Sequence, residues 1–298
     1  MSASASATAT VALLACLPAV ALLTALLLPL TLWLAPRIGT VDIPSEARRM
    51  HTAPTPRCGG LAIFFALWGV LLVAGVLQGA LLWLLLATTV LLTLGLCDDA
   101  FGVAAPIKLA VQLVASAVVV LPLEWPVPAS ISAVLWLTLL TNAHNMIDGI
   151  DALAATAVAV EATALAVLLN EDVLAFSLAI ALLGGCLGYL PYNVHPARLF
   201  MGDEGALVLG FTVGWLTLRL PGAGGLGGQP WRAFLVCLLP LSDLSVCVLR
   251  RLLTGKNPLR ADRAHLHHLL VDRGLSQRRV CLYLCLPATL AAVLAVCL

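Results

Sequence analysis

Long apolar runs follow one another along this 298-residue chain, and short polar connections separate them. An apolar stretch of about 20 residues is long enough to cross the hydrocarbon core of a bilayer as an α-helix. These runs lack the alternation of apolar and polar residues that the strands of a membrane barrel show. Charged residues make up only 10% of the sequence, whereas soluble domains carry about 25%. We therefore expect an all-α, polytopic helical membrane protein.

The apolar runs predict about ten transmembrane helices, or eleven if one boundary is misplaced. The first run precedes the first basic residue, Arg37, so it lacks the basic start of a secretory signal and is expected to be a retained span. No soluble domain or repeat interrupts the pattern, and residues 1–298 are expected to form a single integral membrane domain. The predicted spans are 11–35, 59–78, 80–97, 106–123, 128–146, 152–169, 173–191, 205–220, 231–250 and 279–298.

Basic residues are unevenly distributed when successive spans alternate in direction. Of the 16 Lys and Arg residues, only Arg219 and Arg232 fall on one side of the membrane. Cytoplasmic loops carry such an excess of positive charge, so the basic side is expected to be cytoplasmic and both termini to lie outside. Most acidic residues fall on the same side, which predicts one site assembled from several cytoplasmic loops.

The cysteines and the net charge give little indication of partners. Nine cysteines are present, most of them inside apolar runs, and none forms a CxxC pair. Free cysteine commonly behaves as a small buried hydrophobic residue, so we expect neither a zinc site nor a disulfide framework. The net charge is +1, and no nucleic-acid partner is expected.

Two adjacent carboxylates, Asp98 and Asp99, end the third predicted span in the sequence CDDAFG. They repel each other, and the C-terminal end of a helix disfavours negative charge. Such a costly placement favours cation binding or proton transfer, although two exposed loop acids would give the same pattern. Lys108, at the start of the next span, could neutralise one of the carboxylates or hold a phosphate.

Asp203 stands between two glycines in FMGDEG, directly before another predicted span. The residue could be only an N-cap of that helix. The alternative is a ligand of a hard cation such as Mg²⁺, which prefers carboxylate oxygens.

Four polar residues spaced by three occur in NAHNMIDGID, namely Asn142, Asn145, Asp148 and Asp151. Gly149 is expected to break the helix, so that the two carboxylates converge from a helix end and the next helix start. The two asparagines have an alternative role, because amide side chains also hydrogen-bond helices to one another in membranes.

Two basic loops are candidates for anion binding. In the first loop, Arg48, His51 and Arg57 could contact phosphate, although a basic loop that only sets topology would look the same. The last loop contains the sequence DRAHLHHLL, with Arg263 followed by three histidines. Its excess of positive charge could anchor the chain to anionic lipid or, as we favour, bind an anionic substrate; metal ligation by the histidines is a third alternative.

These features together predict Mg²⁺ held by carboxylates, a positive clamp for several phosphates, and access from the plane of the membrane. The combination favours phosphoryl-type transfer to or from a lipid, since positioning and charge neutralisation dominate such catalysis.

The motifs DIPSEARRMHTAPTPRCGG, CDDAFG, NAHNMIDGIDALA, YNVHPARLFMGDEGAL and DRAHLHHLL resemble, in this order, those of the polyprenyl-phosphate N-acetylhexosamine-1-phosphate transferase superfamily (glycosyltransferase family 4). The last motif resembles the WecA-type branch, which starts O-antigen, common-antigen or teichoic-acid linkage synthesis. The chain departs from the family at Ala152, where glycine is common, and at Ala206, where serine is usual.

The resemblance implies a reaction in the bacterial cytoplasmic membrane. A phosphate oxygen of undecaprenyl phosphate attacks the β-phosphorus of a UDP-N-acetylhexosamine, most simply UDP-N-acetylglucosamine, and UMP leaves. The cofactor is expected to be Mg²⁺, with Mn²⁺ as a substitute, and a homodimer is left open.

The resemblance also implies roles for individual residues. Asp203 and Asp148 would bind the metal, and Asp98, with Asp99 beside it, would orient the lipid phosphate or act as its base. The other residues expected to bind substrate are Arg48, His51, Arg57, Lys108, Asn142, Asn145, Asp151, Asn193, Arg263, His265, His267 and His268.

Alternative functions remain at this stage. The same chemistry could use another donor, such as a UDP-N-acetylfucosamine or the phospho-N-acetylmuramoyl-pentapeptide nucleotide. A different class is a transporter of ions or solutes, because Glu161 falls inside a predicted span and intramembrane acids often serve transport. The clustering of the acids on one side argues against transport.

Overall fold

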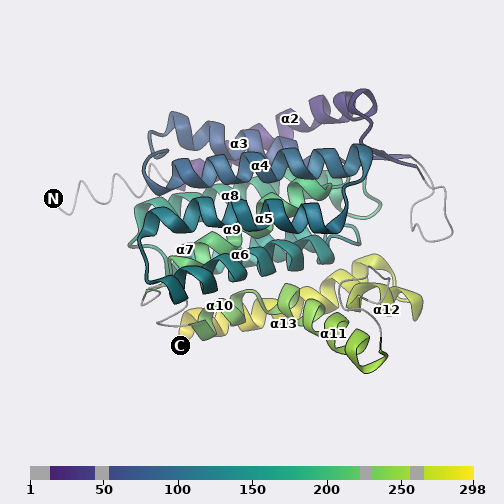
Figure 1. Cartoon of the computed structure of the whole chain (residues 1–298). Coiled ribbons are helices and arrows are strands. Elements are labelled where there is room, and N and C mark those ends of the chain that lie inside the picture. Colours follow the sequence, from purple (N-terminus) through teal and green to yellow (C-terminus); the bar gives the residue numbers. More distant parts are fainter. Residues whose placement is uncertain (1–13, 44–53, 222–229, 256–264) are drawn as a thin grey trace.

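The computed structural model describes residues 14–43, 54–221, 230–255 and 265–298. Within these ranges the protein is almost entirely helical, which confirms the all-α prediction (Figure 1). The helices are α2 (Cys16–Ile38), α3 (Gly59–Val73), α4 (Ala80–Phe101), α5 (Ala105–Val120), α6 (Val127–Ile147), α7 (Leu153–Leu168), α8 (Val173–Asn193), α9 (Asp203–Leu218), α10 (Pro230–Val236), α11 (Leu238–Leu253), α12 (Leu266–Asp272) and α13 (Gln277–Cys297).

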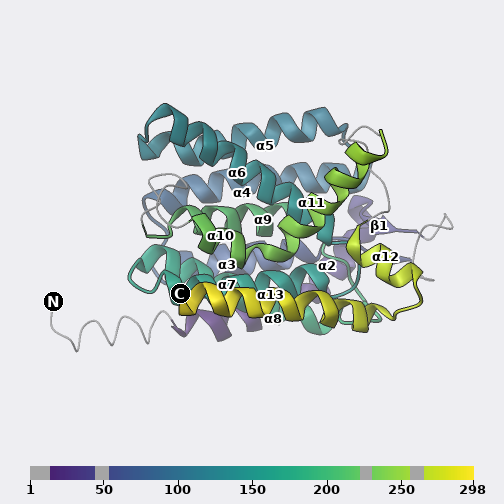
Figure 2. The same ribbon diagram turned by 90° about the horizontal axis from the view of Figure 1, so that it is seen from below.

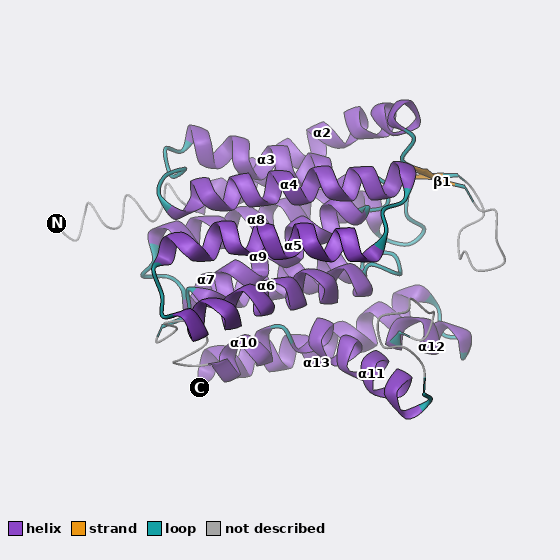
Figure 3. Ribbon diagram, viewed as in Figure 1, coloured by secondary structure: helices purple, strands orange, loops and turns teal. Residues whose placement is uncertain are grey.

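A short antiparallel strand pair was not expected from the sequence. β1 (Val41–Asp42) pairs with β2 (Thr55–Pro56), so that Val41 faces Pro56 and Asp42 faces Thr55. The pair extends beyond the helices at one end of the bundle (Figure 3).

The central helix of the bundle is α9, in which every residue from Glu204 to Leu218 is buried. It packs against α3, α4 and α6, while α8 packs against α2, α3 and α7. Small residues allow this close packing, as is usual between helices in a bilayer. At Gly210, for example, a Cβ atom would lie 3.0 Å from the backbone oxygen of Leu140.

Large apolar side chains are exposed along the outer helices, as expected for a surface that faces lipid rather than water. Leu26 of α2 is 65% exposed and Leu72 of α3 is 63% exposed. By length and apolar composition, five helices in the described part of the chain can cross a membrane: α2, α4, α5 with the short turn that follows it, α8 and α13. The chain is therefore a polytopic membrane protein.

The predicted span 231–250 is not one straight helix. The axes of α10 and α11 differ by 85°, and the break lies at Cys237. Pro240 accounts for the break, because proline has no N–H to bond to Val236 and its ring clashes with that carbonyl. If the bent pair counts as one span, six candidates result; α3 and α7 are apolar but shorter.

The helices alternate in direction, and this places the polar loops together. α4, α6 and α8 end where α5, α7 and α9 begin, and α12 lies at the same end (Figures 1 and 2). We call this the polar end of the bundle. The described residues at the opposite end include Asp172 and Arg219, which form an ion pair.

Candidate active site

Lys108 joins two carboxylates from distant parts of the chain. It lies in the first turn of α5, whereas Asp98 lies in the last turn of α4 and Asp203 is the first residue of α9. Its ammonium group donates to both carboxylates, with 2.7 Å between Nζ and Oδ2 of Asp203. The N–H of Val103 donates to Oδ1 of Asp98 at 2.6 Å. Lys108 thus bridges two carboxylates, where the sequence suggested contact with one.

Asp99 is bound to the start of α9 and to a basic side chain. Its Oδ2 accepts a hydrogen bond of 2.7 Å from the N–H of Asp203, and its Oδ1 lies 3.5 Å from Nη1 of Arg57. A carboxylate is favourable at this place, because helix N-termini carry unpaired N–H groups and partial positive charge. Arg57 also forms a β-bridge with Phe200, so the first basic loop contacts the segment that leads into α9.

The start of α9 is in backbone contact with two neighbouring helices. A Cβ atom on Gly60 of α3 would lie 2.2 Å from Cα of Gly205, and one on Gly95 of α4 would lie 2.2 Å from Cα of Glu204. No side chain fits into either contact. These glycines therefore bring the carboxylates of α4 within hydrogen-bonding distance of α9.

Asp148 ends α6, and the chain turns at Gly149 before α7 begins, as the sequence predicted. Burial raises the pKa of the Asp148 carboxyl group well above its usual value, and the nearby carboxylates of Asp203 and Asp99 raise it further against the opposing charge of Arg57. Asp148 therefore lies within electrostatic reach of the carboxylates on α4 and α9.

The carboxylates of Asp98, Asp99, Asp148 and Asp203 form what we call the acidic cluster. Among the described residues, Lys108 and Arg57 contact these carboxylates, and the charges of Asp203 and Asp99 still raise the pKa of Asp148, so negative charge is crowded within the cluster. A divalent cation would stabilise the ionised form of these carboxylates. The donor atoms are carboxylate oxygens, which Mg²⁺ and Mn²⁺ prefer, and the residues present therefore fit such an ion.

Asp151 and Asn193 are engaged in holding loops rather than facing open space. Oδ2 of Asp151 accepts hydrogen bonds from Nδ1 of His195 at 2.6 Å and from the N–H of Ala197 at 3.1 Å. Asn193 is buried, accepts from the N–H of Ala152 at 2.9 Å and donates to the carbonyl of Leu199 at 2.9 Å. Both side chains fasten the loop between α8 and α9 to the start of α7.

Asn142 forms the interhelical contact that the sequence left open as its alternative role. Its amide exchanges hydrogen bonds with that of Gln112 on α5, at 2.6 Å and 3.4 Å, and also donates to the carbonyl of Thr138. Asn145, one turn closer to the polar end, is half-buried.

The histidines of the last loop lie against the turn that holds Asp148. A Cβ atom on Gly149 would be only 2.1 Å from Nε2 of His267, so the imidazole of His267 rests on that glycine. The rings of His265 and His267 stack with 5.6 Å between centroids, and those of His267 and His268 lie 4.3 Å apart. Burial, reinforced by His268, lowers the pKa of His267 to about 3, so its ring is neutral near pH 7.

Two further residues were not assigned from the sequence. Asp243 of α11 accepts hydrogen bonds from Nδ1 of His265 and from the N–H of Leu266, both at 2.7 Å; the only available signal was a single acid inside an apolar run. Glu161 has a partner that the sequence did not reveal, because its Oε2 lies 2.8 Å from Nε2 of His144 inside the bundle. Three other predicted site residues, Arg48, His51 and Arg263, lie outside the described residues.

The fold and the site define a polytopic membrane protein with a cluster of acidic and basic side chains at one end of its helical bundle. A family model described as glycosyl transferase family 4 matches residues 81–220, which include the whole acidic cluster. The chain belongs to this family.

Curated relatives are similar over most of their length. A probable undecaprenyl-phosphate N-acetylglucosaminyl 1-phosphate transferase of Bacillus subtilis is 33% identical over 87% of this chain and 77% of its own. A decaprenyl-phosphate N-acetylglucosaminephosphotransferase of Mycobacterium tuberculosis is 33% identical over 84% of this chain and 73% of its own. The undecaprenyl-phosphate alpha-N-acetylglucosaminyl 1-phosphate transferase of Escherichia coli K12 is 30% identical over 88% of this chain and 77% of its own.

Proposed function

We propose that the chain transfers N-acetylglucosamine 1-phosphate from UDP-N-acetylglucosamine to undecaprenyl phosphate and releases UMP. The single observation that carries the proposal is the bridge from Asp98 through Lys108 to Asp203 at the polar end, in a chain that belongs to this family. The names of the relatives support both substrates. Another relative is named for decaprenyl phosphate, so the length of the polyprenyl chain has to be tested.

In the proposed reaction, a phosphate oxygen of the lipid forms a bond to the β-phosphorus of the nucleotide sugar. The bond from that phosphorus to the bridging oxygen breaks, and UMP leaves with the oxygen. Asp203 and Asp148 would hold Mg²⁺, which supplies charge neutralisation at the diphosphate when it is bound. The other groups bind and orient the two substrates.

Lys108 is placed to exchange a carboxylate for a phosphate oxygen when substrate arrives, because its three donors can be shared between carboxylates and substrate. Asp98 would orient the lipid phosphate. A phosphomonoester has a second pKa of about 6, so it needs little deprotonation at neutral pH. His267, which is neutral and rests on the turn beside Asp148, and its neighbour His268 would contact the diphosphate or the sugar.

The proposed membrane arrangement has ten spans, with the polar end in the bacterial cytoplasm and both termini outside. The excess of basic residues on this side supports that orientation. Nine of the ten spans would be single helices, and the ninth in chain order would be the bent pair of α10 and α11.

The test is UMP release by the purified protein in detergent, with undecaprenyl phosphate, a panel of UDP-N-acetylhexosamines, and either Mg²⁺ or EDTA. Release that requires lipid, Mg²⁺ and UDP-N-acetylglucosamine supports the proposal. If UMP is released only with another donor, that donor replaces UDP-N-acetylglucosamine in the proposal. If folded protein releases no UMP with any donor, the proposed reaction is rejected, and an uptake assay in vesicles is the next experiment.

Asp203→Asn provides a matched comparison with Asp172→Asn. Both changes remove a negative charge next to a helix N-terminus, but Asp172 lies at the opposite end of the bundle. We expect Asp203→Asn to lower turnover by a factor of about 10² or more and Asp172→Asn to retain it. Near-normal turnover of Asp203→Asn would reject the metal assignment.

A further inference from the structure

Asp243, Cys247 and His265 form a second cluster of side chains that can bind a metal. Oδ2 of Asp243 lies 2.7 Å from Nδ1 of His265, and the same nitrogen lies 3.2 Å from Sγ of Cys247. One donor atom of each residue lies within 4.8 Å of the other two. The three residues are buried, with exposed fractions of 1%, 0% and 8% respectively.

Two structural elements bring these residues together. Asp243 and Cys247 are four residues apart on α11 and so lie on the same face of that helix. His265 directly precedes α12 and has an extended backbone. No CxxC pair is involved, which is why the sequence indicated no zinc site.

We propose that this cluster is a Zn²⁺ site, separate from the Mg²⁺ site of the acidic cluster. Thiolate, imidazole and carboxylate are the common protein ligands of Zn²⁺. Mg²⁺ prefers oxygen ligands and is not expected to compete for a site that contains sulfur. The donor set therefore distinguishes the two sites chemically.

Zinc binding requires the ligands to move apart. Around a tetrahedral zinc ion, a nitrogen and a sulfur ligand are about 3.5 Å apart and a nitrogen and an oxygen ligand about 3.3 Å apart, compared with 3.2 Å and 2.7 Å here. The ion would replace the proton on Nδ1 of His265 and the proton of the Cys247 thiol. Its two positive charges would then be balanced by Asp243 and the thiolate, so no net charge is buried.

The proposed ion would affect the active site through His265. The ring of His265 stacks on that of His267, which rests on the turn beside Asp148. Zinc at Nδ1 would replace the hydrogen bond between His265 and Asp243 and would shift the ring that stacks on His267. We therefore expect Zn²⁺ to inhibit turnover in the presence of excess Mg²⁺, a consequence that rests on the proposed function.

Cobalt titration of the full chain in detergent, with excess Mg²⁺, tests the site without requiring turnover. Co²⁺ is a spectroscopic substitute for Zn²⁺, and a thiolate ligand produces a strong near-ultraviolet band. We expect one equivalent of Co²⁺ to give the band of a single thiolate and stoichiometric Zn²⁺ to abolish it. Absence of the band from the wild-type protein would overturn the proposal, even if the chain releases UMP.

Cysteine variants then identify the ligand. Cys247→Ser should lose the band, while Cys297→Ser, which changes an exposed cysteine at the C-terminus, should keep it. Cys281 and Cys285 are a rival pair because their sulfurs lie 4.0 Å apart, so Cys281→Ser should also keep the band. Persistence of the band in folded Cys247→Ser, or its loss in Cys281→Ser, would contradict the assignment.

Asp243→Asn serves as a second variant if Cys247→Ser does not fold. It retains the thiol but removes one anionic ligand, and we expect the affinity for Co²⁺ to fall by about tenfold or more. Unchanged affinity for Co²⁺ in this variant would show that Asp243 is not a ligand of the metal. In the turnover assay, the rate of Cys247→Ser is measured with and without Zn²⁺. We expect the two rates to be equal, because the variant lacks the zinc ligand.

Discussion

Replacing Lys108 by Met tests the central feature of the acidic cluster, because it removes the positive charge between Asp98 and Asp203 and retains a side chain of similar length. Each charge-assisted hydrogen bond contributes about 1.5–3 kcal/mol when it is well shielded. The three side chains are 16–24% exposed, so water screens part of this. We expect the free energy of unfolding to fall by about 2–4 kcal/mol for the two bonds together.

The effect on turnover should be larger than the effect on folding. If Lys108 transfers a donor to a substrate phosphate, its loss removes a preorganised electrostatic contact, and such contacts contribute about 10²–10³ in rate. The measurements are UMP release and thermal unfolding of the same preparation. Lys108→Arg is the control for charge alone, and it should recover stability better than turnover, because its planar fork cannot reproduce a point charge. Folded Lys108→Met with turnover within twofold of the wild type would refute the reasoning.

Three further changes test how the site is held together. Asp243→Asn should lower turnover about tenfold or more with little change in KM for the lipid, because His265 loses the carboxylate that orients it; kinetics of UMP release decide this. Gly60→Ala should prevent stable folding or abolish turnover, since its Cβ would meet the backbone of Gly205; the yield of monodisperse protein and UMP release are the measurements. Ala152→Gly should raise the free energy of unfolding by about 0.5–1 kcal/mol. Ala152 has φ of 65°, and this left-handed conformation costs about 1–2 kcal/mol for a residue with a Cβ. A chemical unfolding curve measures the change, and a lower free energy of unfolding in the variant would show that the strain is absent.

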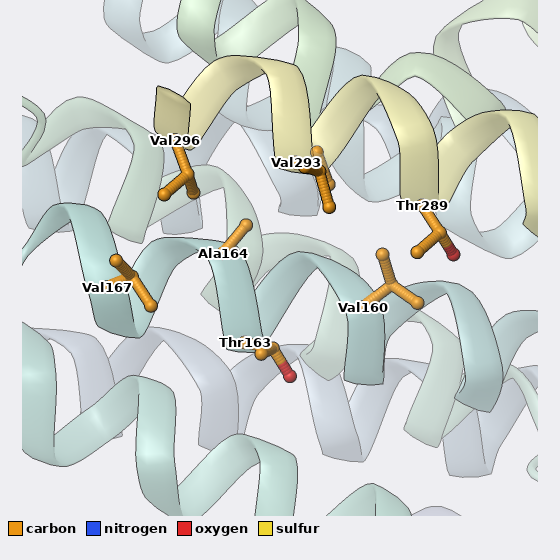
Figure 4. A pocket seen from close by; sticks show the side chains of 8 residues that line it. Val160, Thr163, Ala164, Val167, Thr289, Val293 and Val296 are labelled. Carbon is orange, nitrogen blue, oxygen red and sulfur yellow. The ribbon is translucent and has the colours of Figure 1, made fainter. Parts of the chain in front are cut away.

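An apolar groove lies between α7 and α13, away from the candidate active site. A hollow in the surface therefore does not locate the active site, which is recognised from its charged side chains. Valine, alanine and threonine side chains line the groove, including Val160 and Val293 (Figure 4). It lies along the halves of both helices that are distant from the polar end, and Thr163 and Thr289 are the polar residues in its lining. Such a lining suits lipid contact, and the charged groups required for phosphate chemistry are at the polar end.

The sequence determined the class of the protein and most of its candidate site. Apolar runs of bilayer length require helices, because a chain in lipid must satisfy its backbone hydrogen bonds internally. Since successive helices alternate in direction, every second loop falls at one end, and this places Asp98, Asp148 and Asp203 at the same end of the bundle. The break at Gly149 also followed from local backbone preference.

The tertiary structure decided what each polar residue contacts, because these partners depend on packing between residues far apart in the chain. Lys108 and Asp203 are 95 positions apart, yet they are hydrogen-bonded because glycines on α3 and α4 allow α9 to approach. Side chains of the same type consequently differ in role, for Asp151 fastens a loop whereas Asp148 is the proposed metal ligand. The partner of Glu161 and the cluster around Asp243 likewise follow from which helix faces meet, a property that the spacing of residues along one helix does not contain.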